Sequence, residues 1–134
     1  MNFNRQACGL AILRITVGIV FLMHGWQKLF VFGFHGVAGM LGSMGVPLPA
    51  VFSAILTLVE FFGGLALILG VAVRVASPLL AIDMSTAILL VHIKHGFFSP
   101  GVEFPLTLLA ANLCLALAGP GALSLEAMFR KNRV

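Results

Sequence analysis

The chain has 134 residues, of which 60% are apolar and only 9% are charged. Soluble domains are about 45–50% apolar and about 25% charged, so this composition excludes a small soluble protein and indicates helices packed in lipid. The formal net charge of +4 does not indicate nucleic-acid binding, because the basic residues are scattered through apolar sequence and form no polar, aromatic-interleaved patch.

Four apolar stretches divide the chain, and each is expected to form a membrane-spanning helix. They run over about residues 7–32, 49–73, 75–93 and 104–118. At 1.5 Å per residue the first three can cross a hydrocarbon core of about 30 Å, whereas the fourth needs an extra turn from its flanks. The first stretch is too long for a signal peptide and no cleavage signal follows Phe32, so we expect it to be retained. The sequence predicts an all-α, four-transmembrane-helix bundle that forms one domain over residues 1–134.

The connection between the first two spans is long and contains its own apolar pattern. Apolar residues recur in it at helical spacing: Phe34, Val37, Met40, Leu41 and Met44. This pattern favours a short interfacial helix on the periplasmic side. A Gly-rich loop is the alternative, because the glycines of this segment weaken a helix.

The other two connections are short. Residues 72–74 leave so little room that spans two and three must form an antiparallel hairpin. After the fourth span, Ser124 can cap a short terminal turn.

Basic residues predict the orientation. With four spans both termini lie on one side, which receives five basic residues: Arg5, Arg74, Arg130, Lys131 and Arg133. The other side has mainly Lys28 and Lys94 at its border. By the positive-inside rule we expect both termini in the cytoplasm and a multi-pass protein of the bacterial inner membrane.

Three charged side chains are expected inside the spans at a similar depth. Glu60 lies near the middle of the second span, Arg14 about six residues from the cytoplasmic edge of the first, and Asp83 about eight residues from that edge of the third. These three can meet, and their formal charges sum to a negative value, so a carboxyl is protonated or another donor joins. The group either handles protons or only holds the helices in register.

A second polar layer is expected nearer the periplasm. His24 and Lys28 are four residues apart and share a helical face. A histidine, a lysine and a glutamate at the mouth of an apolar bundle can bind and protonate a quinone or phenolic oxygen. The candidate catalytic residues are His24, Lys28, Glu60, His92 and Glu103. The candidate cofactor-binding residues are Trp26, Gln27, Arg14 and Asp83.

Several of these residues have a structural alternative. Lys28 can snorkel to the surface, Trp26 can anchor the helix at the membrane interface, and Glu103 can cap the fourth span. His92 lies about 180° from Asp83 on an ideal helix, so both face one pocket only if the third span bends. Four further polar residues are expected to form interhelical hydrogen bonds: Thr57, Thr86, Thr107 and Asn112.

No metal, thiol or electron-carrying centre is predicted. The histidines His24, His35, His92 and His95 lack a metal-binding spacing, and Cys8 and Cys114 form no C-x-x-C pair. No flavin, haem or iron-sulfur signature occurs in the sequence. The cofactor is not identified by a motif, and the polar layer makes a quinone the candidate.

Short motifs occur along the chain in an order that resembles the DoxX family of small bacterial membrane proteins. They are HGWQKLF at 24–30, GVPLP at 45–49, EFFGG at 60–64, Gly70, Arg74, His92, GFF at 96–98, Glu103 and GPGALS at 119–124. The match extends over about residues 10–125. The resemblance implies a four-helix membrane fold and a description as an oxidoreductase, with relatives linked to quinone-coupled thiosulfate oxidation or to catechol and quinone stress.

Three functions follow from the residues and the resemblance. The first is a quinone-linked oxidoreductase or redox-complex subunit, in which His24 and Lys28 hold the substrate oxygen, Glu60 and Glu103 move protons, and a partner protein supplies the reductant. The second is a non-enzymatic accessory subunit that recruits a redox partner. The third, small-molecule transport, is less favoured because the chain lacks the paired repeats of known carriers, although a homodimer would supply them.

Overall fold

The computed structural model describes residues 4–133, and these residues form helices and loops with no β-strand among them. The α-helices are α1 (Arg5–Trp26), α2 (Gly33–Ser43), α3 (Pro49–Leu69), α4 (Val73–Ala87), α5 (Glu103–Ala118) and α6 (Leu125–Lys131). A π-helical segment continues α1 over Gln27–Phe32, and another continues α4 over Ile88–His92 before a 3-10 turn at Ile93–His95. The expectation of an all-α fold is confirmed.

Each of the four expected spans coincides with a helix. Three continuous helical runs are long and apolar enough to cross a membrane: Arg5–Ser43, Pro49–Leu69 and Val73–His95. α5 is also apolar but has 16 residues. Its length is about 24 Å, less than a hydrocarbon core of about 30 Å. Three crossings therefore have helices of sufficient length, and the fourth stays a prediction.

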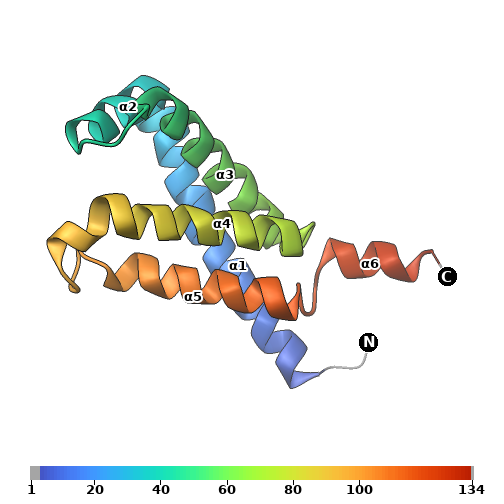
Figure 1. Ribbon diagram of the computed structural model, residues 1–134. Coiled ribbons are helices and arrows are strands. Elements are labelled where there is room, and N and C mark those ends of the chain that lie inside the picture. Colours follow the sequence, from blue (N-terminus) through green and yellow to red (C-terminus); the bar gives the residue numbers. More distant parts are fainter. Residues whose placement is uncertain (1–3, 134) are drawn as a thin grey trace.

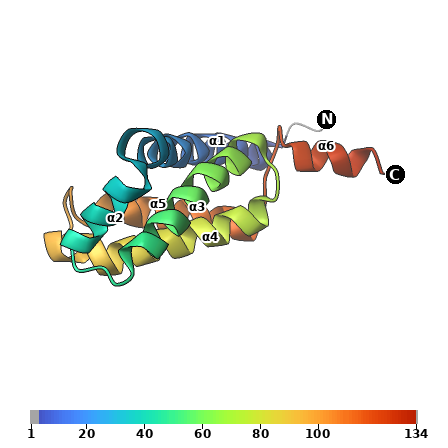
Figure 2. The same ribbon diagram turned by 90° about the horizontal axis from the view of Figure 1, so that it is seen from above.

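The long helices pack as two antiparallel pairs. α1 packs mainly against α3, α4 packs mainly against α5, and α3 also contacts α4. In Figure 1, α4 and α5 run side by side while α1 crosses them at a steep slant. Figure 2 shows α2 at one end of the molecule and the two chain ends at the other. A buried apolar cluster joins these helices and includes Phe21, Leu67, Leu80, Leu108 and Leu115.

Glycines let α1 and α3 approach closely. A Cβ atom added to Gly64 would collide with the backbone nitrogen of Leu22, and one added to Gly25 would collide with the backbone of Phe61. Close backbone approach through small residues is typical of helix pairs in membranes. The sequence motif around Gly64 therefore has a packing role at this crossing.

We expect Gly64→Ala to destabilise the protein by about 1–3 kcal/mol, because the added methyl group overpacks the α1–α3 crossing. Thermal unfolding in detergent, followed by circular dichroism, measures this effect. Gly9→Ala is the matched control, since a Cβ at Gly9 meets no atom within 4 Å. Equal melting temperatures for the two variants would contradict the close crossing.

The short helices at the two ends agree with the sequence pattern. α2 forms where the apolar spacing predicts a helix, and its Val37 and Leu41 are buried against Phe52, Leu56 and Leu90. Whether α2 lies at a membrane surface stays a prediction. At the other end Ser124 Oγ accepts a hydrogen bond from the backbone nitrogen of Ala127 at 3.1 Å, so the predicted cap of α6 is confirmed.

Candidate functional site

An ion pair in the interior joins the extension of α1 to the middle of α3. Lys28 Nζ donates to both carboxylate oxygens of Glu60, at 2.6 and 2.7 Å. The Glu60 side chain is 4% exposed and the Lys28 side chain is 21% exposed. The carboxylate is thus shielded, while the lysine remains reachable from outside. Lys28 turns inward and does not snorkel to the surface.

Asp83 on α4 adds a second carboxyl group beside this pair. Its carboxyl lies close enough to the Glu60 carboxyl for the two groups to interact electrostatically. Its Oδ2 atom is buried and has no hydrogen-bond partner among the described residues. Two carboxyl groups therefore face one ammonium group, and full ionisation would leave a net negative charge in a dry interior, which is costly. We call Lys28, Glu60 and Asp83 the central cluster.

Arg14 does not join these carboxyls, contrary to the sequence-based expectation. Its buried guanidinium donates to five backbone carbonyls: those of Leu67, Ile68, Pro120, Ala122 and Leu123. Ile68 lies eight residues beyond Glu60, a separation of about 12 Å along α3. The expectation that Arg14 meets Glu60 and Asp83 was therefore wrong. The cation beside these two carboxyl groups is Lys28.

The two π-helical segments explain why helical spacing misplaced some side chains. A π turn has a wider repeat than an α turn, so it changes the angular position of every later residue. Lys28 lies in the first segment and His92 in the second. His92 Nδ1 lies 2.7 Å from the carbonyl oxygen of Pro100. His92 and Asp83 therefore have separate partners, and the ideal-helix angle between them does not apply.

The remaining candidates near the end of α1 are not part of the ion pair. His24 is exposed, its Nδ1 lies 2.8 Å from the carbonyl oxygen of Val20, and its ring lies 6.0 Å from the ring of Phe104 on α5. Trp26 contacts Phe30 with ring centroids 4.3 Å apart. Trp26 and Gln27 are both exposed.

Glu103 has a structural contact of its own at the start of α5. Its Oε1 accepts a hydrogen bond from the backbone nitrogen of Ser99 at 3.0 Å. This contact ties the carboxyl to the loop that precedes α5. Ser99 lies outside the helix, so the contact does not cap α5 itself, and the capping alternative stays a prediction. A proton-moving role for Glu103 stays a prediction.

Buried oxygens without a donor extend the polar interior beyond the central cluster. Thr57 Oγ1 and Asn112 Oδ1 are buried with no hydrogen-bond partner among the described residues. Thr57 lies three residues before Glu60 on the same buried face of α3. Asn112 Nδ2 donates within its own helix, to the carbonyl of Leu108 at 2.8 Å. These oxygens are open acceptors for water or a ligand, not the interhelical bonds that the sequence predicted.

Comparison with known proteins decides the family. The DoxX family model matches residues 9–93. The chain belongs to the DoxX family. This matched region contains all three residues of the central cluster, and the match confirms the resemblance drawn from the motifs.

The chain is similar to several curated proteins along most of its length, and two of those described below are named inner membrane proteins. It is 32% identical over 125 residues to "Putative oxidoreductase CatD" of Bacillus subtilis (strain 168), across 93% of this chain and 90% of that protein. It is 33% identical over 131 residues to the inner membrane protein YqjF of Escherichia coli (strain K12), across 92% of this chain and 93% of that protein. The inner membrane protein YphA of the same organism is 29% identical over 124 residues. No solved structure matches the chain.

Proposed function

We propose that this DoxX chain is a quinone-linked redox protein of the inner membrane, in which the central cluster binds a ring oxygen and exchanges protons with it. The Lys28–Glu60 ion pair, with Asp83 beside it, is the observation that carries the proposal. An ammonium group is a hydrogen-bond donor for a ring oxygen, and a pair of carboxyl groups can hold and release protons. The name of the CatD relative supports the redox class.

In the proposed quinone reduction, the residues of the central cluster have different roles. Reduction of a quinone to a quinol adds two electrons and two protons. Lys28 Nζ donates a hydrogen bond to one ring oxygen, and the Glu60–Asp83 pair passes protons to the ring and regains them from water. The two electrons come from a partner redox protein, so this chain supplies position and protons.

Aromatic side chains next to Lys28 provide a surface for the ring. Phe61 directly follows Glu60, and its ring lies 6.3 Å from the ring of Phe30, which contacts Trp26. Flat apolar rings favour offset-stacked or edge-to-face contacts at such separations. The exposed His24, one turn before Lys28, adds a second hydrogen-bonding side chain on the same segment.

The proposed membrane placement completes this arrangement. α5 crosses as a fourth span with help from its flanking turns, α2 lies at the periplasmic interface, and both termini face the cytoplasm. A redox partner protein, and a second copy of the chain in a homodimer, would contact the exposed apolar faces of the helices.

The single tryptophan of the chain provides a local test of quinone binding. Titration of the purified protein with a short-chain ubiquinone analogue is expected to quench Trp26 fluorescence to saturation. Lys28→Gln is expected to weaken this binding by about 10- to 100-fold, because a hydrogen bond from a charged donor contributes about 1.5–3 kcal/mol.

Lys94→Gln removes an exposed lysine outside the central cluster and is expected to bind like the wild type. Unsaturable quenching that is equal in all three proteins would refute the proposed site. That outcome, together with a second polypeptide that co-purifies, would support the accessory-subunit function, in which the cluster only fixes the helices.

A further inference from the structure

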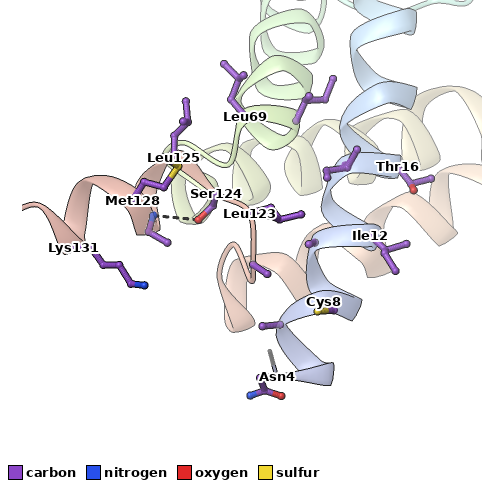
Figure 3. A pocket seen from close by; sticks show the side chains of 16 residues that line it. Asn4, Cys8, Ile12, Thr16, Leu69, Leu123, Ser124, Leu125, Met128 and Lys131 are labelled. Atoms are coloured by element: carbon purple, nitrogen blue, oxygen red, sulfur yellow. Dashed lines mark hydrogen bonds between the residues drawn. The ribbon is translucent and has the colours of Figure 1, made fainter. Parts of the chain in front are cut away.

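A large apolar cavity lies between the first half of α1, the end of α3 and α6 (Figure 3). Its volume is about 770 Å³, within the range of about 300–1,000 Å³ that is typical of ligand sites. Figure 3 shows α1 on one side, the end of α3 above, and the segment leading into α6 on the other side. Apolar side chains from all three elements line it, among them Ile12, Leu69, Leu123 and Met128.

Hydrogen bonds hold the walls of this cavity in place. The buried Arg14 of α1 donates to the carbonyls of Leu67 and Ile68 at the end of α3, and to those of Ala122 and Leu123 before α6. The backbone nitrogen of Glu126 also donates to the carbonyl of Gly70 at 3.0 Å. The hollow is therefore part of a fixed framework between three segments that are far apart in the sequence.

The mouth of the cavity combines exposed apolar side chains with positive charge. Ile12 is 70% exposed and Leu123 is 67% exposed, so the cavity opens toward the surroundings of the helices. The exposed Lys131 also lines it, and Figure 3 shows this side chain extending from α6. No carboxylate belongs to the lining formed by the described residues.

We propose that this cavity binds one anionic phospholipid, with an acyl chain against the apolar lining and the phosphate against Lys131. An apolar hollow in which Lys131 is the one cation among the described lining residues matches an amphiphile that has an apolar chain and a negatively charged head. Basic residues near a membrane surface attract anionic lipids, whereas zwitterionic lipids carry no net charge to pair with Lys131. The site is separate from the central cluster and does not depend on quinone binding.

Native mass spectrometry of the delipidated full chain tests this proposal with two lipids of equal chain length. One phosphatidylglycerol molecule is expected to bind per chain, and more tightly than phosphatidylcholine. Lys131→Gln is expected to weaken phosphatidylglycerol binding by about fivefold, the contribution of one basic residue near an anionic surface. Lys94→Gln, at the opposite end of the molecule, is expected to have no effect.

A second pair of variants tests the place of the acyl chain. Ala127 lines the cavity, so Ala127→Phe is expected to occupy part of it and weaken phosphatidylglycerol binding. Leu117 is 85% exposed and lies outside the lining, so Leu117→Phe is its control and is expected to bind normally. Equal affinity for both lipids, or phosphatidylglycerol binding that neither Lys131→Gln nor Ala127→Phe reduces, would overturn the proposal.

Discussion

Replacement of Lys28 by methionine is expected to lower the free energy of unfolding by about 3–5 kcal/mol, because it leaves the Glu60 carboxylate buried without its cation. The remaining charge would also face the second carboxyl group, that of Asp83. Unfolding in mixed micelles with increasing sodium dodecyl sulfate, followed by circular dichroism, measures this loss.

The double variant Lys28→Met with Glu60→Gln is the decisive comparison. It removes both charges, so we expect it to regain most of the stability that Lys28→Met loses. Lys94→Met controls for the loss of an exposed lysine and is expected to change stability by less than about 0.5 kcal/mol. Additive losses in the double variant would show that the two side chains do not interact.

Replacement of Arg14 by methionine is expected to cost at least about 3–5 kcal/mol, because it leaves several buried backbone carbonyls without donors. Two of these carbonyls belong to the last turn of α3, and the others lie between α5 and α6. Loss of these hydrogen bonds is therefore expected to detach the segment that leads into α6 from α1. Limited proteolysis would detect this change as new cleavage after residue 119.

Arg14→Lys separates charge from geometry in this network. Lysine keeps the positive charge but has three donors on one nitrogen, whereas the guanidinium directs its donors from three nitrogens. We expect Arg14→Lys to recover only a small part of the stability. Wild-type stability for Arg14→Lys would show that charge alone matters at this position.

Helix positions follow from the sequence because they depend on local patterns. The long, mostly apolar stretch after Pro49 predicts α3, the apolar spacing around Val37 predicts α2, and Ser124 predicts the start of α6. The equal depth of Glu60 and Asp83 also follows from the short hairpin between α3 and α4. Each of these features needs only the residues of one helix or of two consecutive helices.

The cation of the central cluster could not be deduced from spacing. Lys28 reaches Glu60 from a π-helical segment, and no residue pattern in the sequence marks that change of repeat. Arg14 finds its partners in carbonyls that are 53 to 109 residues away. Every residue has a backbone carbonyl, so the sequence does not show which carbonyls will bind an arginine. A buried arginine that binds carbonyls therefore cannot be distinguished, from sequence alone, from one that pairs with a carboxylate.

The apolar cavity also could not be predicted from the sequence, because it depends on contacts between distant segments. Its walls come from α1, the end of α3 and the segment around α6, and each wall by itself is ordinary apolar sequence. Arg14 joins these segments through hydrogen bonds, and the hollow lies between them. Shape of this kind is a property of tertiary packing, so it appears only in the folded chain.

Infrared difference spectroscopy on the quinone-loaded protein tests the central claim most directly, because quinone reduction must draw protons through the central cluster. Electrochemical reduction of the bound quinone is expected to give a carboxyl carbonyl signal that disappears in Asp83→Asn and persists in Glu126→Gln. Identical spectra for the wild type and Asp83→Asn would contradict the claim that these carboxyl groups exchange protons with the ring.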